Sequence, residues 1–394
     1  MKEVDMLNRA KGIHDKLIDY RHDFHQHPEV GFHEFRTSAK VAEVLTSLGC
    51  QVRQKVGKTG VVAELGQGMP IVAIRADMDA LPLQEENKTT YASQNPGVMH
   101  ACGHDAHTAI LLGVAELLSR EEQLPGTVRL LFQPAEEVAD EEGFSGAQRM
   151  VQDGAMQGGV GITLALHVSA HIPVGQISIE AGPASGGVDS FRAVIMGMGG
   201  HGARPHETVD PIFLAAHVIL ALNGIVSRRL DPYDPAVVSI GSIHAGKADN
   251  VIPDQVDILG TIRFMQPEVQ KQIHAEIERA FEVAKSLGGN YKLKFEIGTP
   301  PMTNDAKVVE LIKRVAKDLL GKENIVAPQK GLGAEDFGCF SELAPGAMFS
   351  LGSKLEGDER EHHNSRFDVN DDCLPIGAAI LTETTLRYLR QGSL

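Results

Sequence analysis

Cysteine is scarce in this chain of 394 residues, and its four cysteines, Cys50, Cys102, Cys339 and Cys373, lie far apart in the sequence. Such spacing makes a poor disulfide framework, and no Cys-x-x-C pair is present to form a redox motif. The sequence therefore favours a reducing compartment, and we expect the protein in the cytoplasm.

The sequence also lacks the signs of a targeting or membrane-spanning segment. Its first residues are polar and acidic, with no apolar signal core behind them. No apolar run approaches the length of a bilayer span. Basic residues are outnumbered by acidic ones, 37 against 52, for a formal net charge of −15. We therefore expect neither a membrane nor a nucleic acid as a partner.

The chain is longer than one typical core requires, so two domains are expected. Its apolar content of 42% and charged content of 23% are ordinary for a globular protein. Short apolar runs typical of buried strands alternate with segments of helical periodicity; the runs lie at 61–65, 71–74, 128–132 and 162–166, and the helical segments include 108–120 and 147–152. This alternation predicts an α/β fold whose sheet is at least partly parallel.

The pattern changes near Gly186. The next predicted elements are listed in chain order: a strand at 189–196, a helix at 210–228, strands at 236–244 and 255–264, a helix at 267–286 and a strand at 291–297. This β-α-β-β-α-β order is typical of a ferredoxin-like α+β unit. We therefore expect a catalytic domain from residues 1–185 and 298–394, with residues 186–297 inserted as a second domain.

Carboxylates and an imidazole follow the predicted strands of the first domain. Asp77 and Asp79 come after the strand at 71–74, Glu136-Glu137 after the next strand, and His167 directly after the strand at 162–166. Open α/β sheets bind ligands at the carboxyl ends of their strands. These side chains, scattered over ninety residues of sequence, are therefore expected to converge.

One short stretch holds a thiol and three imidazoles, at His100, Cys102, His104 and His107. Thiolate, imidazole and carboxylate are the ligands that borderline divalent metals prefer, and a glutamate beside a ligating glutamate can serve as a base. A lone cysteine is more often a small buried apolar residue, but these neighbours favour ligation by Cys102. The sequence therefore indicates a metallohydrolase active site.

Other histidines are ambiguous when only the residues are considered. His167 fits a core position and a ligand equally well, and His362-His363 lies in a polar stretch that also fits an ordinary surface. The amino-terminal histidines are interpreted as capping or packing residues rather than ligands; they are His22, His25, His27 and His33.

Taken together, the residues resemble the aminoacylase, hippurate hydrolase and indole-acetyl-amino-acid hydrolase family of dinuclear metallopeptidases, in its cysteine-containing amidohydrolase branch. The similarity covers nearly the whole chain through ordered motifs at 25–29, 75–82, 99–105, 132–137, 166–168, 200–206, 250–253, 333–337 and 362–363. The resemblance implies a zinc-exopeptidase-like catalytic domain, with a mixed, mostly parallel sheet between helices, and an inserted lid and dimerisation domain.

The resemblance also implies two divalent transition-metal ions per subunit, Zn, Mn or Co. Their ligands would be Cys102, His104, Glu137, His167 and His363. Glu136 would be the general base, and Asp79 would orient a ligand. Related peptidases carry histidine where this chain has Asp77, which leaves the role of Asp77 open.

By the same resemblance, three residues of the inserted domain would contact the substrate. His201 would enter the partner subunit's active site and polarise the scissile carbonyl. Asn250 and Arg263 would hold the substrate's free carboxylate, for which a guanidinium is well suited, although an ion pair on the sheet is an alternative for Arg263. The expected assembly is a homodimer through the inserted domain, or a tetramer built from it.

The expected activity is metal-dependent hydrolysis of the amide bond of N-acyl-L-amino acids, which releases a carboxylic acid and a free amino acid. One alternative is a metallocarboxypeptidase or dipeptidase that cleaves the same bond in short peptides. A second, from another class, is a non-catalytic protein that binds an amino acid or a metal. Such a protein would have no use for a base at Glu136 or an oxyanion donor at His201.

Overall fold

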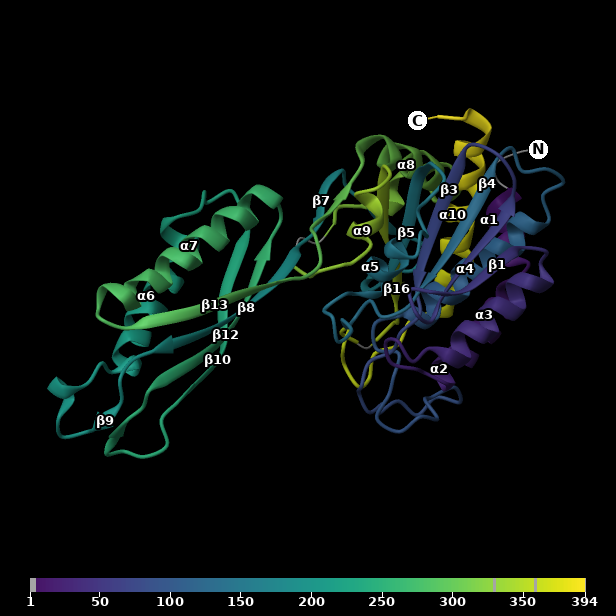
Figure 1. Ribbon diagram of the computed structural model, residues 1–394. Coiled ribbons are helices and arrows are strands. Elements are labelled where there is room, and N and C mark those ends of the chain that lie inside the picture. The colour runs from purple at the N-terminus through teal and green to yellow at the C-terminus, as the bar shows by residue number, and fades with distance from the viewer. Residues whose placement is uncertain (1–4, 329–330, 358–359, 394) are drawn as a thin grey trace. The chain divides into compact units, whose positions relative to one another are not determined.

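The computed structural model describes residues 5–328, 331–357 and 360–393. Within these residues the chain forms two compact units (Figure 1). The first unit contains the chain up to Ala184 and most of the chain from Thr303 on. The second contains Ser185–Met302 and a short later segment that ends at Glu335. The chain passes between them within two short strands, β7 (Gly182–Ser185) and β14 (Met302–Asn304), and again on either side of that later segment.

An eight-stranded sheet is the frame of the first unit, in the order β1-β2-β4-β3-β5-β16-β6-β15. Its strands are β1 (Gln51–Val56), β2 (Gly60–Gly66), β3 (Ile71–Asp77), β4 (Thr127–Gln133), β5 (Val160–Pro173), β6 (Ile177–Ser178), β15 (Ile325–Val326) and β16 (Gly346–Lys354). The central strand β3 runs parallel to both β4 and β5, and β5 runs parallel to β16. Antiparallel pairs of β1 with β2 and of β2 with β4 complete one side. The expectation of a mixed, mostly parallel α/β sheet is confirmed.

Helices cover this sheet. They are α1 (Asp5–Lys11), α2 (His14–Gln26), α3 (Phe35–Ser47), α4 (His104–Ser119), α5 (Gly146–Gln152), α8 (Ala306–Leu320), α9 (Gly338–Ser341) and α10 (Leu374–Gln391), with 3-10 turns at Lys322–Asn324 and Asp371–Cys373. Every residue of β3 and β4 is buried. Such strands carry near-continuous apolar runs because both of their faces are covered.

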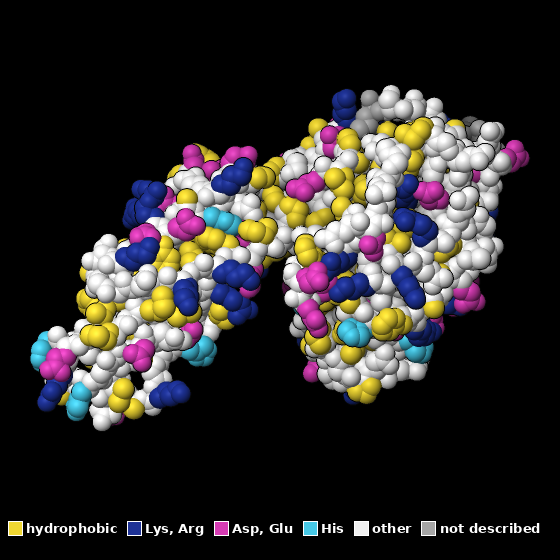
Figure 2. Space-filling model, in the orientation of Figure 1, with side chains coloured by type: hydrophobic (Ala, Val, Ile, Leu, Met, Phe, Trp, Pro, Cys, Tyr) yellow, Lys and Arg dark blue, Asp and Glu magenta, His cyan; other side chains and the backbone are white. Residues whose placement is uncertain are grey.

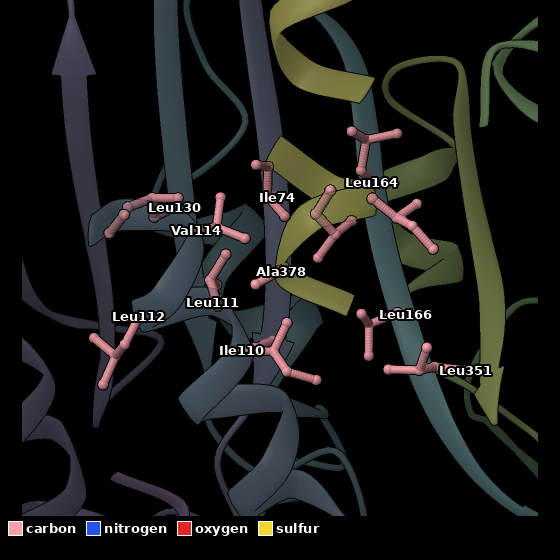
Figure 3. Packing of buried hydrophobic residues seen from close by; sticks show 14 of the residues in the cluster. Ile74, Ile110, Leu111, Leu112, Val114, Leu130, Leu164, Leu166, Leu351 and Ala378 are labelled. Atoms are coloured by element: carbon pink, nitrogen blue, oxygen red, sulfur yellow. The ribbon is translucent and has the colours of Figure 1, made fainter. Parts of the chain in front are cut away.

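Helices α4 and α10 pack on the central strands and form the middle of the core. In Figure 3, Ile110 and Leu111 of α4 lie near Ala378 of α10 and near Ile74 and Leu166 of the sheet. Nearly all of α4 is buried. A helix without a polar face belongs in a core, and this one therefore fixes its first residue, a candidate ligand, against the sheet.

Three predicted boundaries were wrong where they affect the candidate site. The strand predicted at 71–74 extends to Asp77, so Asp77 lies at the end of β3 and not beyond it. The strand predicted at 162–166 continues to Pro173, because β16 pairs with it past His167. His167 therefore lies within β5 and not beyond its end. The helix predicted at 108–120 begins at His104. Strand β1 was not predicted, because its sequence, Gln-Val-Arg-Gln-Lys-Val, is largely polar and exposed.

The second unit is an antiparallel sheet in the order β10-β12-β8-β13, with two helices against it (Figure 1). Its main elements are β8 (Gly187–Met196), α6 (Pro211–Arg228), β10 (Ala236–Ala245), β12 (Gln255–Phe264), α7 (Pro267–Ser286) and β13 (Asn290–Ile297), with a 3-10 turn at Pro205–Glu207. The predicted ferredoxin-like order is confirmed. A separate two-stranded ribbon joins β9 (Gly200–His201) to β11 (Val251–Ile252).

One helix contradicts the expectation that no apolar run reaches the length of a bilayer span. Helix α6 has 18 residues with a mean hydropathy of 1.5, so by length and composition alone it could cross a membrane. Of these 18 residues, 33% are buried. Leu214, Val218 and Leu222 pack into the core of the second unit. The helices of globular cores have the same composition, so we interpret α6 as one of them. Hydrophobic side chains also reach the visible surface of this unit among charged ones (Figure 2).

Candidate metal centre

The five predicted ligands come together at one edge of the first unit. The ligand atoms of Cys102, His104 and His167 lie within 4.8 Å of one another, and those of Cys102, Glu137 and His363 do as well. The two groups share Cys102. Two of the groups that could hold a metal ion therefore have one thiol in common.

Cys102 is held in a tight turn between the sheet and α4. Its Sγ lies 3.5 Å from Nε2 of His167. The next residue, Gly103, has φ 95°, and a Cβ there would lie 2.2 Å from Cγ2 of Val168. Burial raises the pKa of the Cys102 thiol well above its ordinary value. Since only the thiolate is a good metal ligand, a cation at this position is what would favour its ionisation.

His104 is oriented as a metal-binding imidazole usually is. Its Nδ1 lies 2.8 Å from the backbone oxygen of Asp79 and 3.2 Å from Oδ1 of the same residue. Its Nε2 is buried and has no hydrogen-bond partner among the described residues. Metal-binding histidines donate one ring N–H to a carbonyl or carboxylate and leave the other nitrogen for the ion. The sulfur, nitrogen and oxygen donors of the cluster thus fit divalent transition-metal ions.

The glutamate pair follows the end of β4. Glu137 lies with Oε1 at 3.0 Å from Nε2 of His363, and its backbone N–H donates to Oδ2 of Asp79 at 3.0 Å. Asp79 thus contacts both a candidate imidazole ligand and the backbone of a candidate carboxylate ligand. Glu136 has a carboxylate oxygen within 4.8 Å of ligand atoms of His104 and Glu137. Both glutamates therefore face the same cluster.

His107 and Asp77 form a supporting layer that the sequence did not reveal. His107 has Nδ1 at 2.6 Å from Oδ1 of Asp77, and its Nε2 accepts the N–H of Val168 at 2.9 Å. Both ring nitrogens are therefore engaged. Arg75 donates to the other oxygen of Asp77 at 2.6 Å. The signal for this layer was two charged residues, Arg75 and Asp77, in an otherwise apolar strand.

The amino-terminal residues include a second buried layer beside the ligands. His25 is fully buried, with Nδ1 at 2.8 Å from Oδ2 of Asp105 and Nε2 at 3.2 Å from Oε1 of Glu85. Burial alone would lower its pKa, but the hydrogen bond and charge of Asp105, together with the hydrogen bond to Glu85, raise the pKa of His25 to about 9. Both ring nitrogens of His25 contact carboxylates and leave none for an ion, which agrees with its interpretation as a packing residue.

Arg21 is the residue of this layer that sequence reasoning missed. It is 1% exposed and donates to Oδ2 of Asp105 at 3.1 Å, to Oδ1 of Asp371 at 2.6 Å, to the backbone oxygen of Val369 at 3.1 Å and to Asp368. Asp105 follows His104, and the other acceptors follow His363 in the chain. The available signal was an arginine on the buried side of α2, between Leu17 and Phe24.

The remaining predicted site residues belong to the second unit. His201 lies on the two-stranded ribbon and Asn250 directly precedes its strand β11. Both are exposed, and the N–H of Gly202 donates to the backbone oxygen of Asn250 at 2.9 Å. Strand β12 begins at Gln255, and Arg263 lies near its opposite end, eight residues further along. That separation is about 26 Å at roughly 3.3 Å per residue. Arg263 donates to Thr261 and to the backbone oxygen of Ile262, and it forms no ion pair, the predicted alternative, with any residue that the structure describes.

Comparisons with known proteins agree with this architecture. The model of peptidase family M20/M25/M40 matches residues 73–387. Thermostable carboxypeptidase 2 of Saccharolobus solfataricus is 39% identical over 381 residues, 95% of each chain. An IAA-amino acid hydrolase of Arabidopsis thaliana is 39% identical over 392 residues, 97% of this chain and 88% of the relative.

A solved structure is similar over the same length. A dinuclear metal-binding peptidase of the M20 family from Bacillus subtilis superposes with a TM-score of 0.83 at 34% identity, covering 96% of this chain and 99% of its own. The resemblance inferred from the ordered motifs is thereby confirmed. The chain belongs to peptidase family M20/M25/M40 and is a hydrolase of that family.

Proposed function

We propose that this protein hydrolyses the amide bond of N-acyl-L-amino acids with two divalent transition-metal ions, Zn, Mn or Co, in its first unit. The observation that carries the proposal is the pair of adjoining ligand groups that share Cys102. One relative is named a carboxypeptidase and another an IAA-amino acid hydrolase, and both names support a substrate bond between an acyl group and an amino acid. A short peptide is the alternative substrate.

We assign the ions to Cys102, His104, Glu137, His167 and His363. When bound, such ions supply an activated water nucleophile and polarise the scissile carbonyl. Glu137 is the better candidate for the ligating glutamate because it groups with Cys102 and His363. Glu136 is then the general base, which takes a proton from the nucleophile and returns it to the leaving amine.

We assign the first unit to metal binding and the second to a lid that also joins two copies of the chain. Arg263 lies eight residues along β12 from Gln255, about 26 Å at roughly 3.3 Å per residue, and Asn250 comes before β11, on the other side of Gln255 in the chain. Residues so far apart in one unit do not reach a single carboxylate. If both hold it, they belong to different protomers, with Asn250 and its ribbon neighbour His201 supplied in trans.

An apolar surface supports association through the second unit. Ile212, Phe213 and Leu220 of α6 are 48%, 56% and 71% exposed. Exposed apolar residues clustered on one helix often mark an interface. We propose a homodimer, or a tetramer built from it. We also propose a reducing compartment such as the cytoplasm, because the four cysteines of this chain are widely spaced and buried.

Removal of the metal is expected to abolish activity, and a divalent transition ion is expected to restore it, because the nucleophile depends on the ion. The assay uses N-acetyl-, benzoyl- and benzyloxycarbonyl-amino acids beside dipeptides, with protein stripped and then reloaded with Zn, Mn or Co. Elemental analysis follows the metal content. Full turnover of the stripped protein would rule out the proposed chemistry, and a preference for dipeptides would favour the peptidase alternative.

Mixing two inactive variants tests the role of His201. His201→Ala and Glu136→Gln homodimers should each be nearly inactive. After subunit exchange, a mixed dimer contains one site with Glu136 from one chain and His201 from the other. Equal mixing makes about half of the dimers mixed, so about a quarter of wild-type activity should return. Verified mixed dimers without recovery would show that His201 does not act in trans.

A further inference from the structure

Glu34 is a fully buried carboxyl group for which the proposed chemistry so far has no use. It is 0% exposed and stands directly before α3. Its Oε1 accepts the backbone N–H of Ala135 at 2.8 Å, and its Oε2 accepts the hydroxyl of Thr59 at 2.5 Å. A buried carboxyl group is costly unless its oxygens are paired. Here one of the two partners is the residue that precedes Glu136.

Ala135 has an unusual backbone conformation, with φ 45° in the left-handed region. Residues other than glycine enter that region only when their surroundings enforce it. Two hydrogen bonds hold the turn, since the N–H of Ala135 donates to Glu34 and its carbonyl accepts from the N–H of Gly146 at 2.9 Å. Packing is also close, because a Cβ on Gly31 would lie 3.0 Å from the Cβ of Ala135.

A second buried carboxylate holds the other side of the same turn. The N–H of Glu137 donates to Oδ2 of Asp79 at 3.0 Å. The backbone is thus fixed at positions 135 and 137 by two acidic side chains from distant segments, and Glu136 lies between these two anchors. The direction of the Glu136 side chain therefore depends on both.

We propose that Glu34 is a positioning residue that acts through the Ala135 amide to hold Glu136 in its working orientation. This role rests on the proposed function of Glu136 as the base. Asp79 anchors Glu137 independently, so the loss of Glu34 should misplace the base more than it disturbs metal binding.

Two substitutions of Glu34 separate positioning from charge. Burial, reinforced by the charge of Asp79, raises the pKa of Glu34 to about 7, so a neutral side chain of the same shape is well tolerated there. Glu34→Gln keeps an oxygen that can accept from Ala135, whereas Glu34→Ala removes it. Ile312→Ala, in the core on α8, is the matched control for a general loss of packing.

The first measurement is hydrogen exchange of the Ala135 amide in the metal-free protein, which requires no catalysis. Exchange should be at least about tenfold faster in Glu34→Ala, because the amide loses its acceptor, and near the wild-type rate in Glu34→Gln and Ile312→Ala. If Glu34→Ala does not fold, Glu34→Asp, whose side chain is one methylene shorter, replaces it. Unchanged protection in the truncated variant would overturn the proposal.

The second measurement is the kinetics of the metal-loaded protein. Glu34→Ala should lower kcat by about a hundredfold, the scale expected for a group misplaced by about 1 Å, while KM and metal content stay near wild type. The kcat of Glu34→Gln, which keeps the acceptor, should be much closer to that of the wild type. Equal losses in the two Glu34 variants, or an equal loss in Ile312→Ala, would overturn the proposal. A wild-type protein inactive on every amide would instead refute the proposed function and leave the exchange result as the test of the contact.

Discussion

Glu136→Gln is expected to lower kcat by about 10²–10⁴-fold, the usual contribution of general acid–base catalysis, while both metal ions stay bound. The amide keeps the size of the side chain but cannot take a proton. In our assignment one residue serves both proton transfers, so the loss should approach the upper end of that range. Steady-state kinetics on the best acyl-amino acid, with metal content measured on the same sample, gives the result.

Glu137→Gln is the matched control, since it makes the same change one residue along the chain. Glu137 lies 3.0 Å from His363 and groups with Cys102, so this variant should lose metal, and its activity should depend on added metal. If Glu136→Gln loses the metal and Glu137→Gln keeps it, the roles within the pair are reversed. If both variants turn over normally, neither glutamate serves the reaction.

Arg21→Met is expected to destabilise the protein by about 3–5 kcal/mol, the usual cost of removing one partner from a buried ion pair. The change leaves Asp105 and Asp368, which are 1% and 4% exposed, without the guanidinium that lies between them. Urea denaturation of the metal-free protein measures the loss. Because Asp105 follows His104 in the chain, weaker metal binding should accompany it.

Arg120→Met provides the control for removing an arginine from the same unit. Arg120 is 51% exposed at its side chain and pairs with Glu116 at 2.7 Å. Surface pairs of this kind contribute about 0.2–1 kcal/mol, so the loss of stability should be several times smaller than in Arg21→Met. Equal losses in the two variants would contradict the structural role assigned to Arg21.

The sequence predicted most of the repeating structure because the signals for it are local. Strand β12 and helix α7 have the predicted bounds, since their apolar periodicity and the proline at the start of α7 act within a few residues. The errors in predicted boundaries occurred where pairing with a neighbouring strand determines the end of an element. Strand β5 continues past His167 only because β16 pairs with it there, and no residue of 162–173 encodes that pairing alone.

In the candidate site, too, some features follow from local sequence and others only from the folded chain. The sequence by itself determined the types of candidate ligand and their order along the chain, because Cys102, His104 and the glutamate pair lie in short motifs with recognisable chemistry. Only the tertiary structure decided that Cys102 is common to two groups and that both nitrogens of His107 are engaged. Arg21 and Glu34 likewise had no local signal of function. Their partners lie between 25 and 350 residues away along the chain, and hydrogen bonds across such separations exist only after the chain has folded.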